Sequence, residues 1–486
     1  MSEAGEGPLT EDELAAFAQR LLGSGGDRHL LVAVSGGVDS MALMHLAAEA
    51  VRKTGRGRVM AATVDHGLRP ESADEARFVA EQAQRIGLAH RTLVWHGAKP
   101  STGIQAAARA ARYHLLAQVC HSELCGRRTL LTAHTMDDQA ETLVMRLARG
   151  SGVEGLSGIR EFESFQFDID ERDQSPVLSG TRRITPPVAV ARPFLGLPKS
   201  RLIATMRARG LAWIEDPSNE NAAFERVRIR RAMPVLQELG LTSEALARSA
   251  RRLRSVRVAL DQLTLQALND QSLVRIDPLG FADIDRAFWA DQDRTLPIAI
   301  QLRALAALIR AVGGAGPHIS LQSLEVVMGE LGRDWALPQP PSCATTLGRA
   351  KIMRSVKGVR IVREAGRGLP PPVQVTPSLA MIWDGRFDVR VGEDAPAGLE
   401  LRALGPAGRA ILKSENACPP GVLADVIDTL PAFWQGDKLV AVPVLADAWH
   451  QINPAFSRGM ADRLGRFART TFRDGRDQYD GLPDLE

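Results

Sequence analysis

A glycine-rich hexapeptide near the start of the chain has the residue types needed to hold a polyphosphate. Ser35-Gly36-Gly37-Val38-Asp39-Ser40 follows the apolar segment 30–34 and precedes a segment with helical spacing. Glycines let backbone N–H groups approach a ligand, and a helix N-terminus attracts anions. Asp39 repels bare phosphate, so we expect it to hold a Mg²⁺ that bridges phosphate oxygens. The alternative is a simple turn capped by Ser40, but the complete hexapeptide in this position favours a nucleotide site.

Two other phosphate-binding motifs are excluded. The hexapeptide lacks the lysine of a Walker A loop, so ordinary transfer of a γ-phosphate is not expected. Gly150-Ser151-Gly152-Val153-Glu154-Gly155 has the spacing of a dinucleotide-binding fingerprint. It follows a predicted helix instead of a strand, and therefore indicates a glycine-rich helix end.

Charged residues in two predicted helices form further candidates. Arg109 and Arg112 lie three residues apart, a spacing that can direct two cations at one anion, although a solvated helix stripe has the same spacing. Asp137, Asp138 and Glu141 begin a later helix, where acidic residues also stabilise the helix dipole. Asp137 and Glu141 share a face, which is unfavourable unless a cation lies between them. A metal ion or an ammonium group would satisfy them.

The elements that carry these residues alternate between strands and helices. We predict strands at 30–34, 59–64, 91–95 and 129–133, and helices at 39–53, 71–86, 104–119 and 137–148. This order predicts an α/β fold with an N-terminal parallel sheet and helices on both faces. Ligands of such sheets bind beyond the carboxyl ends of the strands, where the candidate residues lie.

The rest of the chain predicts two further domains. We expect an N-terminal extension at 1–27, the α/β domain at 28–195, a helical domain at 196–336 and a small α+β domain at 343–486. Helix starts near Ser200 and Ser243 support the second domain, and short apolar runs at 351–353, 359–362 and 439–442 predict strands in the third. The acidic segment 161–173 is expected to be an exposed loop, and 337–342 (LPQPPS) a linker.

Composition excludes several classes of protein. The 486 residues are 45% hydrophobic and 24% charged, which is typical of globular proteins. The four cysteines form no C-x-x-C pair, and the acidic N-terminus lacks the features of a secretory signal. The apolar segment 296–315 contains Arg303 and Arg310, so we expect a buried helix and no membrane span. We therefore expect a cytoplasmic protein.

Two arginine clusters in the predicted helical domain indicate an RNA partner. The net charge of +3 is only mildly basic, but the arginines are concentrated at 226–231 and 248–257. Dense arginine clusters favour contacts with a phosphate backbone. Aromatic residues make up only 5% of the chain, which favours recognition of folded RNA over stacking on single strands.

The hexapeptide resembles the SGGxDS pyrophosphate loop of the N-type ATP pyrophosphatases, which adenylate a substrate oxygen and release pyrophosphate. The later motifs closely resemble, in family order, the tRNA(Ile)-lysidine synthetase family. They are 65–69 (DHGLR), 105–113 (QAAARAARY), 133–142 (AHTMDDQAET), 149–152 (RGSG), 192–194 (RPF) and 215–219 (EDPSN). Thr135 and Val227 depart from the family, which often has a histidine and an Arg-Asn pair there. The specific match covers about residues 30 to 235.

The resemblance implies a two-step reaction. O2 of cytidine 34 in the CAU anticodon of tRNA(Ile) attacks the α-phosphate of ATP, and the ε-amine of free L-lysine then displaces AMP at C2. The product, lysidine, converts the tRNA to isoleucine specificity. The cofactors implied are ATP, as a substrate, and Mg²⁺.

The resemblance also implies residue roles. Ser35, Gly36, Gly37, Val38, Asp39 and Ser40 bind ATP with Asp65 and His66, and Arg109 and Arg112 stabilise the departing pyrophosphate. Asp137 and Glu141 orient the lysine amine, with His134 and Asp138 beside them. The tRNA or lysine is contacted by Arg192, Arg228, Arg231, Arg251 and Arg252.

Three alternative functions use the same sequence features. A PP-loop tRNA thiolase would need catalytic cysteines, but Cys120 and Cys125 fall at the end of a predicted helix, where structural cysteines are more common. A non-catalytic RNA-binding protein would not need Asp39, Asp137 and Glu141. A glutamine-dependent synthetase lacks a recognisable amidotransferase domain here. ATP pyrophosphatase activity would separate the enzymes from the binding protein.

Overall fold

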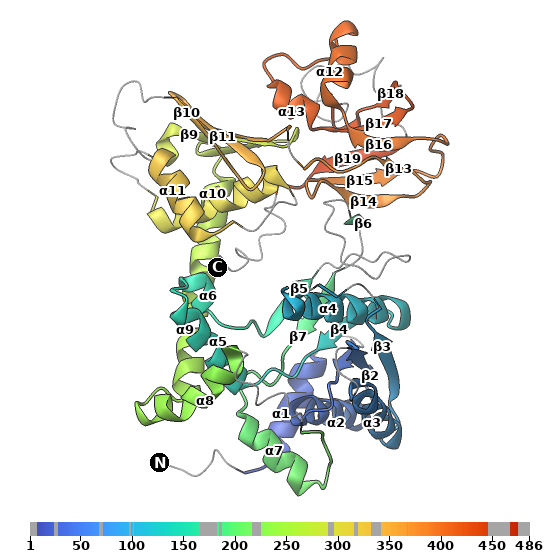
Figure 1. The fold of residues 1–486 in the computed structure, drawn as a ribbon, viewed down its shortest axis with the longest axis vertical. Helices are drawn as coiled ribbons and strands as arrows, with labels where there is room; N and C mark the ends of the chain where they lie inside the picture. Colours follow the sequence, from blue (N-terminus) through green and yellow to red (C-terminus); the bar gives the residue numbers. More distant parts are fainter. Residues whose placement is uncertain are drawn as a thin grey trace. The chain divides into compact units, whose positions relative to one another are not determined.

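The computed structural model describes the chain in two compact units, each treated separately below (Figure 1). The units comprise Met1–Pro176 with Thr185–Ser255, and Val177–Ile184 with Val256–Glu486. The described residues are 7–23, 28–67, 71–96, 99–100, 102–165, 182–183, 187–215, 225–289, 296–314, 319–331, 342–366, 368–445 and 467–474.

The first unit is built on a six-stranded sheet with the order β3-β2-β1-β4-β7-β5. Five strands are parallel: β1 (Arg28–Ala33), β2 (Arg58–Asp65), β3 (Ala89–Val94), β4 (Arg127–Leu131) and β7 (Val188–Ala191). The sixth, β5 (Phe162–Phe165), pairs antiparallel with β7. The strand order runs from β1 to β2 and β3 on one side and through β4 to β7 on the other. It therefore reverses at β1 and β4, where an open α/β sheet binds its ligands.

Helices cover both faces of this sheet (Figure 1). One face packs against α1 (Glu11–Leu22), α2 (Val38–Thr54), α3 (Ser72–Arg85) and α7 (Lys199–Ala208). The other packs against α4 (Ile104–Glu123). Leu30 faces the first layer and Leu31 the second, and both are fully buried. Strands buried on both faces are continuously apolar, which explains why the sequence pattern located β1, β2 and β4. The short strand β7, also apolar, was not predicted.

Three further helices of the first unit pack together. They are α5 (Met136–Ala148), α8 (Glu225–Glu238) and the start of α9 (Ser243–Asn269), which share a small core that includes Leu143, Met233 and Leu246. The short α6 (Val153–Leu156) follows α5. The glycine-rich segment 150–155 therefore lies after a helix, as its context predicted.

The structure confirms the predicted α/β fold and its strand-helix alternation. The prediction for 161–173 is wrong at its start, because β5 occupies Phe162–Phe165, and the remainder of that segment lies outside the described residues. Main-chain pairing with β7 stabilises this strand, whose four residues include one acidic side chain, Glu163.

The second unit contains three antiparallel sheets. The first has the order β10-β11-β12-β9-β8, from β8 (Val274–Asp277), β9 (Phe281–Asp285), β10 (Cys343–Leu347), β11 (Ala350–Ser355) and β12 (Gly358–Arg363). The second is β13-β16-β17-β18, from β13 (Val373–Gln374), β16 (Glu400–Ala403), β17 (Pro431–Gln435) and β18 (Lys438–Ala441). The third is β19-β15-β14-β6, from β6 (Arg182–Arg183), β14 (Ala380–Trp383), β15 (Phe387–Val391) and β19 (Ala468–Phe472).

Besides the end of α9 and the short 3-10 helix Arg286–Phe288, the described residues of this unit form four helices. They are α10 (Ile298–Gly313), α11 (Leu321–Leu331), α12 (Gly405–Ser414) and α13 (Ala424–Asp428). The buried helix expected at 296–315 is confirmed as α10, in which Arg303 is buried and forms an ion pair with Asp261 of α9. In the described part of the chain, no helix combines the length and apolarity needed to cross a membrane.

Contacts between residues divide the chain at other positions than the expected domain boundaries, which were between 195 and 196 and between 336 and 343. The division into units falls within α9. Strands β8 and β9 precede the segment 337–342, yet they share a sheet with β10, β11 and β12, which follow it. Hydrogen bonds between strands distant in sequence produce this arrangement, and local breaker residues carry no signal for them. Apart from Ser342, the expected linker lies outside the described residues.

Candidate active site

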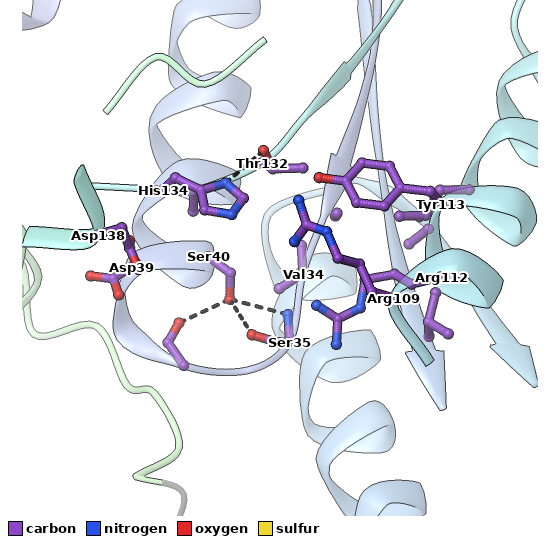
Figure 2. A pocket seen from close by; sticks show the side chains of 16 residues that line it. Val34, Ser35, Asp39, Ser40, Arg109, Arg112, Tyr113, Thr132, His134 and Asp138 are labelled. Atoms are coloured by element: carbon purple, nitrogen blue, oxygen red, sulfur yellow. Dashed lines mark hydrogen bonds between the residues drawn. The ribbon is translucent and has the colours of Figure 1, made fainter. Parts of the chain in front are cut away.

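A cavity of about 220 Å³ lies at the carboxyl ends of β1 and β4 (Figure 2). It is lined by residues of the hexapeptide, β2, α4, α5 and the segment after β4: Ala33, Val34, Ser35, Gly37, Asp39, Ser40, Ala62, Val64, Arg109, Arg112, Tyr113, Leu116, Thr132, Ala133, His134 and Asp138. In Figure 2, Asp39 and Asp138 lie on one side of the cavity, and Arg109 and Arg112 on the other. Oppositely charged walls suit a ligand that carries phosphate and a cation together.

The hexapeptide is held closed by its own hydroxyl groups. The Ser40 hydroxyl donates to the Gly37 carbonyl at 3.0 Å and accepts from the Ser35 backbone N–H at 3.1 Å. Gly36 has a φ of +87°, and a Cβ there would lie 2.9 Å from Ile214. Gly37 is the N-cap of α2 and makes no side-chain cap. The first N–H groups of α2 are therefore left to an anion.

Asp39 is a partly paired carboxylate of the cavity lining. Its Oδ2 lies 3.1 Å from Nζ of Lys199, while its Oδ1 is buried without a hydrogen-bond partner. Burial raises the pKa of Asp39, Lys199 lowers it, and the nearby Asp138 and Asp137 raise it further. An orphaned, buried carboxylate oxygen fits the predicted role of Asp39 as a ligand of a hard cation.

The two arginines of α4 are held by aromatic rings. The Arg109 guanidinium lies over the Tyr113 ring, 5.1 Å from its centroid. Arg112 donates to Nε2 of His66, with Nη2 at 3.0 Å and Nε at 3.3 Å. Burial and the neighbouring Arg112 lower the pKa of His66 to about 4, so its ring stays neutral and accepts this bond at neutral pH. His66 thereby orients Arg112.

Asp65 and His66 do not line the cavity. Asp65 Oδ1 accepts the Gly67 backbone N–H at 2.7 Å and the Ser72 hydroxyl at 2.6 Å. These bonds stabilise the turn after β2, and the hydrogen bond from Ser72 lowers the pKa of Asp65. The structure therefore places this pair outside the cavity lining. Asp65 stabilises the turn, and His66 contacts Arg112.

The three acidic residues of α5 have different partners. Asp138 lines the cavity and forms a capping box with Thr135, whose backbone N–H it accepts at 2.8 Å. Asp137 accepts the Lys199 backbone N–H at 2.8 Å and the Ser243 hydroxyl at 3.1 Å. Asp137 thus joins the starts of α7 and α9 to α5.

Glu141 engages a separate set of cations. It is buried and forms ion pairs with Arg230 Nε at 2.8 Å and Arg226 Nε at 3.4 Å. Glu141 and Asp137 lie outside the residues that line the cavity. The sequence predicted one cation shared by the two carboxylates. In the structure each carboxylate has its own protein partners, because α7, α8 and α9 each bring donors to α5.

The remaining predicted residues fall into three groups. His134 lines the cavity, bonds through Nδ1 to Thr132 Oγ1 at 3.1 Å, and has its pKa lowered to about 4 by burial. Arg192 is 1% exposed and donates to the Arg160 carbonyl at 2.7 Å and to Glu163 at 3.0 Å, away from the cavity lining. The side chains of α8 and α9 that were expected to contact RNA are exposed: Arg228, Arg231, Arg251 and Arg252.

Sequence reasoning missed Lys199, Tyr113 and the specific role of Arg230. Tyr113 lies within the motif 105–113, but its contact with Arg109 follows from the helix turn between them. Lys199 is separated from Asp39 by 160 residues, so no local pattern announces their contact. Arg230 belongs to the arginine cluster that was assigned to RNA, and only tertiary packing directs it to Glu141.

Comparisons with known proteins agree with this geometry. The PP-loop domain family matches residues 10–237. The tRNA(Ile)-lysidine synthase of Rhizobium meliloti (strain 1021) is 34% identical, over 94% of this chain and 94% of its own length. The chain belongs to the tRNA(Ile)-lysidine synthase family.

Further relatives extend this result. The tRNA(Ile)-lysidine synthase of Methylobacterium nodulans is 45% identical over 68% of this chain and 88% of its own length. The tRNA(Ile)-lysidine synthase of Bradyrhizobium diazoefficiens is 41% identical over 72% of this chain and 90% of its own length. Among solved structures, the U34-tRNA thiolase NcsA from Methanococcus maripaludis is 16% identical, covering 50% of this chain and 79% of its own, with a TM-score of 0.39. Family membership confirms the resemblance and the PP-loop fold predicted from the sequence.

Proposed function

We propose that this member of the lysidine synthase family joins L-lysine to C2 of cytidine 34 in the CAU anticodon of tRNA(Ile), converting ATP to AMP and pyrophosphate. One observation carries the proposal. The cavity brings the pyrophosphate loop, the orphaned Oδ1 of Asp39 and two arginines of α4 to the carboxyl ends of two central strands.

The first step is adenylation of the cytidine. The α-phosphate of ATP would accept O2 of the base, and the bond to the bridging oxygen of pyrophosphate would break. The N–H groups at the start of α2 bind phosphate oxygens, and Arg109 and Arg112 stabilise the charge that develops on pyrophosphate. Asp39 would hold Mg²⁺, which when bound neutralises part of the phosphate charge.

The second step is attack of the lysine ε-amine on C2, with departure of AMP. Asp138 supplies the carboxylate that reaches the cavity. The low pKa of His134 keeps that ring neutral, so it adds no positive charge beside an incoming ammonium group. Asp137 and Glu141 would orient the amine only after exchanging their present partners in α7, α8 and α9.

The RNA would be bound through the exposed arginines of α8 and α9. When binding depends on phosphate contacts of this kind, the affinity for RNA falls steeply as the salt concentration rises. The fall is roughly one power of the salt concentration for each contact. We further propose a cytoplasmic location, where ATP, lysine and tRNA are available together.

A thiolase is disfavoured by the cysteines. Burial raises the pKa of Cys120 to about 12, so it is not a thiolate at neutral pH. Within the described ranges, the histidine, cysteine and acidic residues form no group of three or more suited to a metal or cluster.

The deciding experiment incubates the protein with ATP, Mg²⁺, lysine and a tRNA(Ile) transcript with anticodon CAU, followed by nuclease digestion and mass spectrometry. We expect a lysine adduct confined to cytidine 34 that requires ATP. Asp39→Asn should abolish it, whereas Glu11→Gln, a matched change at an exposed carboxylate, should not. Absence of the adduct, with an active relative as positive control, would contradict the proposal.

A further inference from the structure

Lys199 forms an ion pair with Asp39, the carboxylate that the proposed function assigns to a metal ion. Its Nζ lies 3.1 Å from Oδ2 of Asp39. The Lys199 side chain is 42% exposed and that of Asp39 is 23% exposed, so solvent and ligands reach this pair. No family motif that the sequence matched includes Lys199.

The main chain of Lys199 is fixed. Its backbone N–H donates to Asp137 Oδ2 at 2.8 Å, and the Leu197 carbonyl accepts from Met136 N at 3.0 Å. Leu202 and Met206 anchor α7 in the core, with exposures of 0% and 1%. Lys199 therefore has a fixed backbone and a flexible stem of four methylene groups, which lets its ammonium move without moving the helix.

The charges around Asp39 favour an exchange of cations. Asp138 lies beside Asp39 in the cavity, and Asp137 is close enough to act on it. The Lys199 ammonium is the cation that pairs with Asp39 in the structure. A second cation on Asp39 would repel that ammonium at short range. Asp39 lies in the first turn of α2, at the helix N-terminus where polyphosphate is expected.

We propose that Lys199 is a polyphosphate-binding residue that neutralises Asp39 in the nucleotide-free protein and transfers to phosphate oxygens of ATP when a divalent cation takes its place. This role rests on the proposed function, because it assumes that ATP and a divalent cation bind this cavity. It assigns to the start of α7 a part in ATP binding that no sequence motif indicates.

The test measures metal and nucleotide binding separately in the full-length protein. Mn²⁺ binding to the nucleotide-free protein is followed by electron paramagnetic resonance, and ATP and AMP binding by calorimetry. We expect Lys199→Met to bind Mn²⁺ about tenfold more tightly and ATP about tenfold more weakly, the size of one charged hydrogen bond, with AMP binding unchanged. Lys199→Arg should restore ATP binding.

Arg207→Met is the matched control, because Arg207 is an exposed cation on the same helix. It should leave all three affinities unchanged. If Lys199→Met binds Mn²⁺ no more tightly than the wild type, or loses AMP and ATP affinity equally, the inference is overturned. Should Lys199→Met fail to fold, Lys199→Gln gives the same titrations.

The lysidine assay distinguishes failure of this inference from failure of the proposed function. Suppose that the wild-type protein makes no lysidine, but Lys199→Met binds Mn²⁺ more tightly and ATP more weakly than the wild type. The inference about Lys199 then stands and the proposed function is contradicted. If the wild type makes lysidine but Lys199→Met does not show those opposite changes in affinity, the proposed function stands and the inference about Lys199 is contradicted.

Discussion

Two aspartates, one in each unit, show how the same residue type serves binding or stability. Asp384 is fully buried, and both of its oxygens are bonded: Arg363 donates to Oδ2 at 3.0 Å and to Oδ1 at 3.2 Å, and Arg386 donates to Oδ2 at 2.8 Å. Asp39 has one oxygen paired with a partly exposed lysine and the other without a partner.

The difference lies in whether partners can be exchanged. Arg363 and Arg386 are fully buried, so neither can leave Asp384 without exposing an unpaired charge to the protein interior. Lys199 can leave Asp39 for water or phosphate. A closed ion cluster stabilises a fold, whereas an open pair keeps a site available to ligands.

Asp384→Asn should have the largest effect, on the stability of the second unit. Removing the charge leaves two buried guanidinium groups without their anion, and we expect a loss of about 3–5 kcal/mol in the free energy of unfolding. Urea unfolding followed by tryptophan fluorescence would measure it. Asp425→Asn breaks a partly exposed pair with Lys351 and should cost at most about 1 kcal/mol. Equal losses in the two variants would contradict the comparison.

Arg112→Met should reduce lysidine formation by roughly 10²–10³-fold, because one preorganised cation is lost from the cavity. Its stability should change little, since His66 is neutral and requires no counter-ion. Turnover under single-turnover conditions and thermal unfolding would be measured together. A variant with normal turnover but lower stability would show that Arg112 is structural, like the arginines at Asp384.

The open site should also make the first unit sensitive to acid. His134 and His66 have pKa values of about 4 in the folded protein, below the ordinary 6.5. Below pH 6.5 the unfolded chain binds protons that the folded chain does not, so stability is full above pH 6.5 and declines as the pH falls towards 4. By pH 4, His134 alone should cost on the order of 3 kcal/mol of folding stability. Titration of its ring near 6.5 by NMR would contradict this expectation.

Thr135→Ala should have the smallest effect. Thr135 caps α5 with its side chain, and loss of such a cap costs about 1 kcal/mol. It also releases Asp138 from the Thr135 hydroxyl at the cavity wall. Thr135→Ser keeps a hydroxyl and should retain wild-type stability in the same urea titration, which separates loss of the cap from loss of the methyl group.

Much of the first unit could be predicted from the sequence, because its signals are local. Strands buried on both faces are apolar throughout, and the hexapeptide carries the turn, the anion site and Asp39 within six consecutive residues. The strand β5 was missed because it opens the acidic segment 161–173, and its pairing with β7 joins segments that are distant in sequence. The sheet shared across 337–342 was missed for the same reason.

The sequence by itself determined the family, the α/β fold and part of the cavity wall, namely the loop, Arg109, Arg112 and Asp138. Only the tertiary structure decided which charges meet. Lys199 reaches Asp39 across 160 residues, Arg230 reaches Glu141 across 89, and Asp137 turns to α7 and α9. Ion pairs have no sequence period, because any basic residue brought within a few ångströms of an acidic one can form them.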